Sequence, residues 1–192
     1  MVESLETDRL ILRMFRESDL DSYAEMCGDA EVMKYLGGVP MTRSEAWRNM
    51  AMVLGHWQLC GFGLWAVEDR QSGALVGRVG CWRPEGWPGL ELAWTLRRAF
   101  WGQGYATEAA RAALDVAFGP LGQTHVISMI DSENQPSIRV ARRLRMRLEG
   151  QADLMGHPVL IYGLRCPPNK RDIPPAHAPS RGSITPQSPI HR

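Results

Sequence analysis

The amino-acid sequence predicts a mixed α/β fold that forms a single domain over residues 1–166. Segments that alternate apolar and polar residues, as half-buried strands do, are interspersed along the chain with segments of helical periodicity. Apolar residues make up 44% of the 192 residues and charged residues 22%, which are ordinary values for a globular protein. A chain of this length supplies one sizeable hydrophobic core, so we expect one domain.

The first half of the chain is expected to form one strand, two helices and two further strands. "RLILR" alternates as a half-buried strand does, and "ESDLDSYAEMC" begins with the capping candidates Ser18 and Asp19 and then places Leu20 and Tyr23 on one helical face. The turn "RQSG" separates the last two strands. The expected strands cover residues 9–13, 61–69 and 73–82, and the expected helices cover 17–27 and 44–58.

The second half alternates between strands and helices. "LELAWTL" at residues 90–96 is strictly alternating, with Trp94 on the leucine face and Glu91 on the opposite face. The helix that follows is expected to stop at Gly119 and Pro120, and the next helix carries Pro136 in its first turn. The expected helices cover 107–118 and 134–146, and the expected strands cover 124–130 and 157–165.

The last 26 residues, 167–192, form a tail of different composition. They are rich in proline and serine and nearly free of large apolar side chains, so they cannot bury enough surface to offset the entropy of ordering. We therefore expect a Pro/Ser-rich C-terminal tail outside the domain.

Composition excludes several classes of protein and of partner. The formal net charge of +1 gives no global attraction to nucleic acid or to anionic membranes, and no apolar run approaches the roughly 20 residues of a membrane span. The acidic N-terminus is unlike a secretory signal, and the four cysteines form no CxxC pair, so we expect reduced thiols, no metal site and a cytoplasmic protein. The oligomeric state is left open, with a homodimer among the alternatives.

The stretch "WGQGYATEAA", residues 101–110, joins an expected strand to an expected helix through two glycines. A helix N-terminus carries unpaired N–H groups and a partial positive charge, and Gly102 and Gly104 would let a phosphate approach those groups closely. A loop without a ligand is the alternative. The stretch is not a P-loop, since no lysine follows, and it is not a Rossmann loop, since Thr107 replaces the third glycine.

Three stretches together resemble the GNAT superfamily of N-acyltransferases. "TLRRAFWGQGYATEAARAALDVAF" is similar to the acyl-CoA pyrophosphate loop of that superfamily. "LETDRLILRMFRESDLD" resembles the opening of its RimJ/RimL-type branch, which acetylates protein N-terminal amines and has relatives acting on small amines. "DSENQPSIRVARRLRMRLEG" resembles the strand–helix segment that follows in that branch. The resemblance spans residues 4–165 and implies a mostly antiparallel sheet of six or seven strands, splayed at its centre, with helices on both faces.

The resemblance also implies which residues would hold acetyl-CoA as the acyl donor. The loop would cradle the pyrophosphate through backbone N–H groups, and the arm of the donor would lie between two splayed strands. Asn134 and Ser137 would face the arm near its thiol end. The implied contacts of the loop and of the strand before it are Thr95, Leu96, Arg97, Gly102, Gln103, Gly104, Tyr105, Ala106 and Thr107.

Two positions depart from the family pattern. The family often has Gln or Arg three residues before the first loop glycine, where this chain has Ala99 with Arg97 and Arg98 just upstream. The helix after Asn134 usually ends with Leu-Gly, where this chain has Arg145, so that arginine must take a conformation that favours glycine.

Acetyl transfer to a primary amine, either a protein N-terminus or a small molecule, requires an amine free of its proton, a stabilised carbonyl oxygen and a departing thiolate. Glu91 is the candidate general base, with a solvated or ion-paired glutamate as the alternative. The N–H group near Leu96 could polarise the carbonyl. Ser137 could protonate the thiolate, cap its helix or contact the donor, and Tyr162 is a further candidate acid or a core residue.

Two other functions remain as alternatives at this stage. A non-catalytic acyl-CoA-binding module would keep the loop and lack the chemistry. A nucleic-acid-binding regulator would use the arginines of residues 139–147, although a solvated helix face is the favoured explanation, because the chain has no net basic excess and no recognised nucleic-acid-binding motif. Trp47, Trp57 and Trp65 could shape an apolar acceptor pocket or pack in the core.

Overall fold

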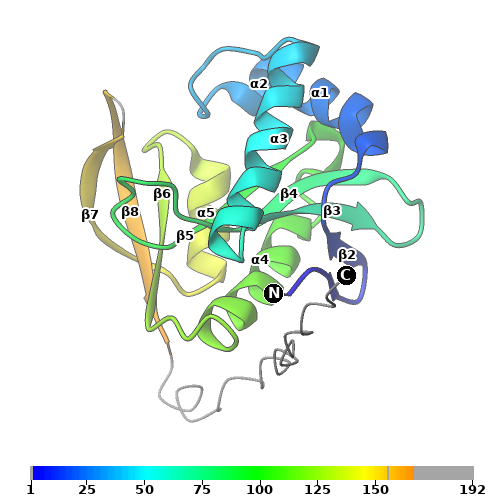
Figure 1. Cartoon of the computed structure of the whole chain (residues 1–192). Coiled ribbons are helices and arrows are strands. Elements are labelled where there is room, and N and C mark those ends of the chain that lie inside the picture. Colours follow the sequence, from blue (N-terminus) through cyan, green and yellow to red (C-terminus); the bar gives the residue numbers. More distant parts are fainter. Residues whose placement is uncertain (1, 155, 167–192) are drawn as a thin grey trace, which may run out of the picture.

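The computed structural model describes residues 2–154 and 156–166, which form a central sheet flanked by helices (Figure 1). The expected tail of residues 167–192 lies outside the described residues. The strands are β1 (Leu5–Glu6), β2 (Leu10–Arg13), β3 (Leu64–Asp69), β4 (Leu75–Trp82), β5 (Glu91–Leu96), β6 (His125–Ile130), β7 (Arg147–Leu154) and β8 (His157–Arg165). The helices are α1 (Leu20–Gly28), α2 (Ala30–Met33), α3 (Arg43–Cys60), α4 (Tyr105–Phe118) and α5 (Gln135–Arg143).

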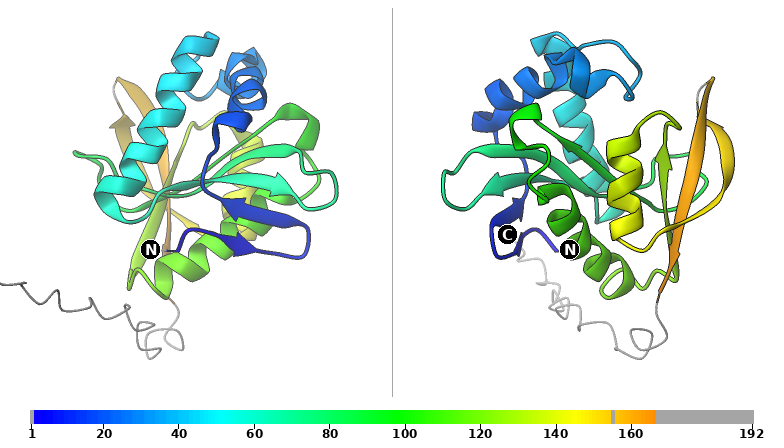
Figure 2. Two further views of the ribbon diagram at one scale, coloured as in Figure 1. Left: turned by 45° about the vertical axis from the view of Figure 1, so that its right-hand side comes forward. Right: turned by 180° about the vertical axis from the view of Figure 1, so that it is seen from behind.

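Helices cover both faces of the sheet, with α3 on one face and α4 and α5 on the other (Figures 1 and 2). Trp57 of α3 donates its indole N–H to the Leu64 carbonyl at 2.9 Å, and its ring meets the ring of Trp65 edge to face. On the opposite face, α4 approaches the sheet closely because its inner surface consists of small, fully buried residues, namely Ala109, Ala110, Ala113 and Ala117.

The sheet is interrupted at its centre. Its strand order is β1-β2-β3-β4-β5-β6-β8-β7, and β5 and β6 are the parallel neighbours among otherwise antiparallel described strands. All six residues of β5 pair with β4, whereas β5 and β6 are in register only at Glu91 and Ile127. Beyond that pair the two strands diverge, so the second half of β5 presents a backbone edge to open space.

The predicted fold class is confirmed: the sheet is mixed, mostly antiparallel and splayed at its centre, with helices on both faces. The described residues form eight strands rather than six or seven. The two strands that were not expected are β1, which has two residues, and β7, which is mostly exposed. In β7 only Leu148 and Leu154 are large apolar residues, and a register shift between Leu148 and Gly150 interrupts the alternation, so its sequence is a weak strand signal.

The end of α5 explains the departure at Arg145. Arg145 donates its backbone N–H to the carbonyl of Arg142, and Met146 donates to that of Ala141, which together make the hydrogen-bond pattern of a Schellman motif. This motif requires a left-handed residue after the helix, and Arg145 adopts a φ of 66° there. The expected glycine-like conformation is therefore confirmed, on a residue with a side chain.

Replacing Arg145 with glycine should raise the free energy of unfolding by about 1 kcal/mol, because a left-handed residue with a Cβ costs roughly 1–2 kcal/mol and glycine returns part of that in backbone entropy. Urea unfolding measures the change. Arg142→Gly, inside the exposed face of the same helix, is the matched control and should lose about 1 kcal/mol. A loss of stability in both variants would contradict the left-handed conformation of Arg145.

Candidate functional site

Two cavities meet at the divergence of β5 and β6. The loop cavity, of about 490 Å³, lies beside the glycine loop, the start of α4 and the start of α5. The Glu91 cavity, of about 550 Å³, lies beside α3, β4 and β6 and contains the Glu91 carboxyl. Both cavities are lined by Trp94, Thr95, Asn134 and Ser137, so they join at these residues.

The glycine loop presents its backbone to the loop cavity. Gly102 and Gly104 have φ values of 76° and 84°, in the left-handed region where a side chain would be strained. Gly104 is the N-cap of α4 and offers no side-chain acceptor, so the N–H groups of the first helical turn have no cap. The loop and first-turn residues lining this cavity are Gly102, Gly104, Tyr105, Ala106 and Thr107, an arrangement that could hold an anion.

Arg9 of the loop before β2 holds the glycine loop in place. Its guanidinium donates to the Gln103 carbonyl at 3.0 Å and to the Glu108 carboxylate of α4 at 2.7 Å. The same guanidinium lies 4.4 Å from the ring centre of Tyr105. Arg9 thereby fixes both the loop and the first turn of α4.

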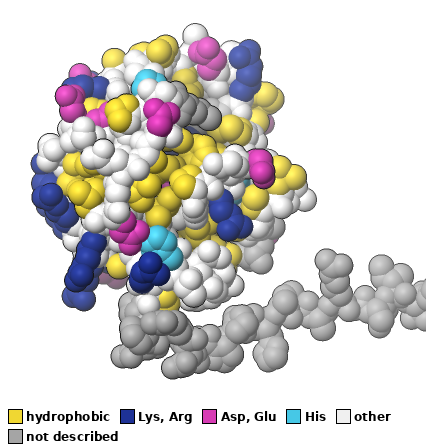
Figure 3. Space-filling model, turned by 90° about the vertical axis from the view of Figure 1, so that its left-hand side faces the viewer, with side chains coloured by type: hydrophobic (Ala, Val, Ile, Leu, Met, Phe, Trp, Pro, Cys, Tyr) yellow, Lys and Arg dark blue, Asp and Glu magenta, His cyan; other side chains and the backbone are white. Residues whose placement is uncertain are grey.

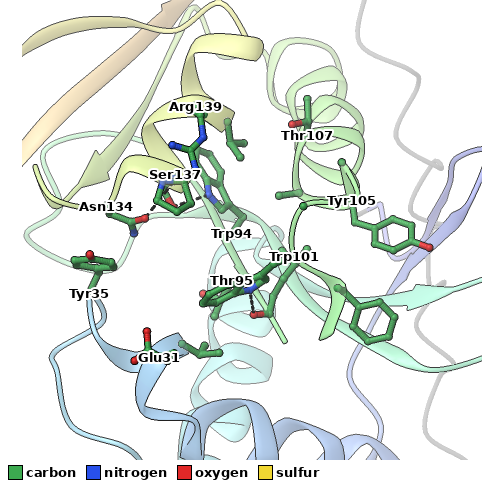
Figure 4. Close-up of a pocket in the computed structure, with 18 of the residues that line it drawn as sticks. Glu31, Tyr35, Trp94, Thr95, Trp101, Tyr105, Thr107, Asn134, Ser137 and Arg139 are labelled. Atoms are coloured by element: carbon green, nitrogen blue, oxygen red, sulfur yellow. Dashed lines mark hydrogen bonds between the residues drawn. The ribbon is translucent and has the colours of Figure 1, made fainter. Parts of the chain in front are cut away.

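The side chains of the loop point elsewhere than into the loop cavity. The Gln103 amide donates to the Ala99 carbonyl at 2.9 Å, and the Tyr105 hydroxyl donates to Asp69 at 3.0 Å. Figure 4 shows the Tyr105 ring directed away from the cavity. Among the predicted loop residues, Gln103 and Tyr105 could therefore contact a ligand through their backbones.

The backbone of β5 faces the opening at alternate residues. Arg97 donates its N–H to the Val76 carbonyl at 2.9 Å, and Thr95 lies opposite Arg78, two residues along the same ladder. Hydrogen-bonded pairs alternate in an antiparallel ladder, so the backbone groups of Thr95 and Arg97 point toward β4. Those of the even-numbered residues, including Leu96, point toward the opening.

The N–H groups of Thr95 and Arg97 are directed toward β4 rather than toward the opening. Thr95 still lines both cavities, so its contact with the donor stays a prediction. The Arg97 guanidinium donates to the Leu75 carbonyl and the Glu25 carboxylate, away from the loop cavity. The Arg98 guanidinium pairs with Asp29, so neither arginine replaces the side chain missing at Ala99. Leu96 lines the loop cavity as expected, but its carbonyl accepts the Trp101 indole N–H at 2.8 Å.

The start of α5 brings Asn134 and Ser137 to the junction of the two cavities (Figure 4). Asn134 is the N-cap, and its side-chain oxygen accepts the backbone N–H of Ser137 at 3.2 Å. The capping role considered for Ser137 is thus filled by Asn134. The Ser137 hydroxyl oxygen accepts the Trp94 indole N–H at 3.2 Å, which leaves the hydroxyl proton available for donation.

Glu91 is the buried member of the groups that could act as a base in the lining of the two cavities, which are Glu31, Glu91, Asp131 and His157. The Glu91 side chain is 9% exposed, and its two oxygens accept the Trp87 indole N–H at 2.7 Å and the Met129 backbone N–H at 3.4 Å. Burial raises the pKa of the Glu91 carboxyl from 4.5 to about 7, against the opposing effect of the hydrogen bond from Trp87. A carboxyl that titrates near neutral pH can accept a proton from a ligand in the cavity.

Three aromatic residues take the core position that was one of their two alternatives. Trp57 and Trp65 are 2% and 0% exposed and belong to the core, as does Tyr162 at 4%. Trp47 is 54% exposed and lies outside the lining of both cavities. The tryptophans that line the cavities are Trp82, Trp87, Trp94 and Trp101. Trp94 was predicted to share the leucine face of its strand, but no motif marked it as a site residue.

The arginines of residues 139–147 are exposed and fall into two groups. Arg139 and Arg143 line the loop cavity, where they add positive charge near the glycine loop, whereas the other three do not line it.

Figure 3 shows the face of the molecule on which β7 and β8 lie, with hydrophobic side chains gathered at its centre and Lys and Arg side chains toward its margins.

Two features of the described residues bear on other functions. Residues 2–154 and 156–166 contain no group of three His, Cys, Asp or Glu side chains placed to hold a metal ion. In the same residues, no helix combines the length and the apolar character that crossing a membrane would require.

Comparison with known proteins agrees with this geometry. Residues 9–147 match the family described as "Acetyltransferase (GNAT) domain". The uncharacterised protein YkkB of Bacillus subtilis strain 168 is 31% identical over 164 residues, which cover 82% of this chain and 93% of YkkB. The uncharacterised N-acetyltransferase p20 of Bacillus licheniformis is 28% identical, over 78% of this chain and 85% of its own. A crystal structure of an acetyltransferase from Agrobacterium tumefaciens has a TM-score of 0.78 and 28% identity, over 86% of this chain and 96% of its own.

The raised pKa of Glu91 should make stability depend on pH. Since the folded pKa of about 7 lies above the ordinary 4.5, the folded state retains a proton that the unfolded state loses, and stability falls as pH rises between these values. The loss should reach about 3 kcal/mol in the wild type and be absent from Glu91→Gln. The free energy of unfolding of the variant should therefore rise relative to that of the wild type as pH increases from 4.5 to 8. Urea unfolding at several pH values measures this, and a difference independent of pH would contradict the shift.

Proposed function

Because the chain belongs to the GNAT acetyltransferase family, we propose that it transfers an acetyl group from acetyl-CoA to a primary amine by direct attack within a ternary complex. The observation that carries the proposal is the meeting of two cavities at the β5–β6 opening, one with an anion-binding loop and the other with a buried acid whose pKa is about 7. One cavity would take the acyl donor and the other would take the amine.

The loop cavity fits the acyl donor. The N–H groups of the first turn of α4, beside Gly102 and Gly104, would bind the pyrophosphate, and Arg139 and Arg143 would balance the remaining phosphate charge. The even-numbered backbone edge of β5 would pair with the amide groups of the donor's arm. The free amide N–H groups of Asn134 would donate to the same arm, since the side-chain oxygen is already used.

Glu91 would take the proton that the amine loses. An α-amino group has an ordinary pKa of about 8, so a base with a pKa near 7 is well matched to it at neutral pH. The reaction forms the bond between the amine nitrogen and the carbonyl carbon, breaks the bond between that carbon and sulfur, and moves one amine proton to Glu91.

Trp94 would stabilise the thioester carbonyl oxygen, and Ser137 would protonate the departing thiolate. The Trp94 backbone N–H points into the opening between β5 and β6, where it would polarise the thioester carbonyl, a role that the sequence analysis assigned near Leu96. The Ser137 hydroxyl would donate its proton to the departing thiolate and then regain a proton from solvent, to which Glu91 would release the proton taken from the amine. The Trp94 indole N–H donates to the Ser137 oxygen, so the Ser137 hydroxyl proton is directed away from the indole.

The choice of branch within the family is a further part of the proposal. The opening stretch of residues 5–21 and the stretch of residues 131–150 support a RimJ/RimL-type acetyltransferase, which acts on a protein N-terminus or a small amine. A non-catalytic acyl-CoA-binding module would have no need of a carboxyl whose pKa is raised toward neutrality, so Glu91 favours the enzyme.

Glu91→Gln should lower kcat/KM for amine acetylation by about a hundredfold, because general bases contribute roughly 10²–10⁴-fold. In the wild type kcat/KM should rise with pH around 7 as the Glu91 carboxylate forms, and this rise should be absent from the variant. Release of free thiol from acetyl-CoA with a panel of amines and peptides measures the rate.

Calorimetric titration with acetyl-CoA is the control for this variant, and its affinity should match that of the wild type. Equal rates in the two proteins would reject Glu91 as the base. If the wild type binds acetyl-CoA but acetylates none of the panel, the binding-module alternative gains instead. A salt titration of binding to DNA and RNA tests the nucleic-acid alternative, which a lack of affinity at low salt would end.

Ser137→Ala should lower kcat by about tenfold while the dissociation constant of acetyl-CoA changes less than twofold, because the hydroxyl acts on the departing thiolate. Single-turnover rates and calorimetry separate the two effects. Ser132→Ala, an exposed serine that lines neither cavity, is the matched control. A weakened affinity for acetyl-CoA with an unchanged kcat would instead make Ser137 a donor contact only.

A further inference from the structure

Arg78 of β4 is an unusual member of the Glu91 cavity, because its guanidinium is held by neutral groups only. One nitrogen, Nη1, donates to the Tyr23 hydroxyl of α1 and to the Asn49 side-chain oxygen of α3, both at 2.6 Å. The Tyr23 hydroxyl in turn donates to Asn49 at 2.6 Å. These contacts fix the position of the guanidinium in the wall of the cavity.

The guanidinium of Arg78 has no carboxylate in direct contact. No carboxylate of the described residues lies within 4.0 Å of its nitrogens, whereas Arg13 and Arg97, the other described arginines that are not exposed, both have such a partner. The charge of Arg78 acts on Glu91 from a greater distance and lowers the pKa of that carboxyl against the effect of burial. Burial raises the pKa of Tyr23 to about 12, so the phenol stays neutral and supplies no charge. A guanidinium has five N–H donors, and two are used here, which leaves three for a ligand.

Arg13 shows how this chain treats an arginine whose role is structural. Its guanidinium is buried, and it is satisfied by Asp19 at 2.8 Å and by Glu68 at 2.7 Å. Arg78 differs from Arg13 in lining a cavity and in lacking a carboxylate. A cavity that presents an unpaired guanidinium beside a base is suited to a ligand that brings its own anion.

Resting on the proposed function, we propose that the acceptor is a small amine that also carries an anionic group, a carboxylate or a phosphate. Arg78 binds the anion through the donors that Tyr23 and Asn49 leave unused. The amine then lies beside Glu91 at the junction of the two cavities. Arg78 is thus a specificity-determining residue for the acceptor.

The register of the sheet sets the spacing between the two charged groups of the acceptor. Arg78 lies opposite Thr95, and Glu91 is four residues from Thr95 on the same face of β5, so the two backbone positions are about 13 Å apart. Part of this separation is spanned by the side chains. The remainder suits an amine and an anion several bonds apart, as in an ω-amino acid, better than the adjacent groups of an α-amino acid.

The wall between the two groups fits a hydrocarbon linker. Met41, Met52, Trp82 and Trp87 line the Glu91 cavity. These side chains would cover the methylene groups of an ω-amino acid, which have no polar atoms to satisfy. The neutral alkylamine of the same length would gain the same apolar contacts, so the preference between the two reports on Arg78.

The test compares alkylamines with ω-aminocarboxylates and ω-aminophosphonates of three to six carbons, using thiol release from acetyl-CoA. We expect kcat/KM to be at least tenfold higher for an anionic acceptor than for the alkylamine of equal length. In Arg78→Gln this ratio should fall toward one, through a rise in KM for the anionic acceptor, and Arg78→Lys should keep part of it. The carboxylate and phosphonate arms decide which anion is preferred.

Arg111→Gln is the matched control for the loss of one positive charge, because Arg111 is exposed on α4 and lines neither cavity. Its selectivity should equal that of the wild type. If the wild type acetylates alkylamines as well as their anionic counterparts, the inference is wrong while the proposed function stands.

If no amine is acetylated, the proposed function fails, and calorimetry then tests the anion site directly. Binding of an ω-aminocarboxylate in the presence of CoA that Arg78→Gln abolishes would support the inference. Lack of such binding to the wild type would overturn it.

Discussion

The divergence of β5 and β6 is the constraint on which the rest of the site depends. Strands that part leave N–H and C=O groups without a ladder partner, and a buried backbone group without a partner is costly. Here the strands are in register only at Glu91 and Ile127. Three side chains make hydrogen bonds to backbone groups that the other strand leaves unpaired. The Ser128 hydroxyl donates to the Leu92 carbonyl at 2.6 Å, and the Glu91 carboxylate accepts the Met129 N–H. The Trp101 indole donates to the Leu96 carbonyl.

The side-chain hydrogen bonds that replace backbone pairing also create the chemical features of the site. Glu91 occupies the place where β6 would otherwise pair, and that place is buried, which is why the pKa of its carboxyl rises. The N–H group of Trp94 points into the same opening and is left to a ligand. The opening in the sheet is therefore the feature that joins the two cavities and presents both a carboxyl of raised pKa and a hydrogen-bond donor.

The sequence predicted the parts of this arrangement that depend on local pattern. The alternation of "LELAWTL" placed Glu91 and Trp94 on opposite faces, and the two glycines marked the loop whose backbone lines a cavity. It could not predict backbone direction, because whether Thr95 or Trp94 faces the opening depends on which residues pair with β4. Nor could it predict that Arg97 is occupied by Glu25 of α1, a contact between residues far apart in the chain.

The division of the site between elements would separate donor binding from acceptor choice. The proposed donor side is built from β5, α4 and α5, and Arg9 fixes its loop through Glu108 and Gln103. The proposed acceptor side is completed by α1 and α3, which reach the sheet through Tyr23, Asn49 and Arg78. Because these two sets of contacts share no residue, substitutions in α1 or α3 can alter the wall around Arg78 and leave the anion-binding loop intact. Acceptor specificity can then change without loss of the acyl donor, since the opening between β5 and β6 holds the reactive groups at a fixed place between the two sides.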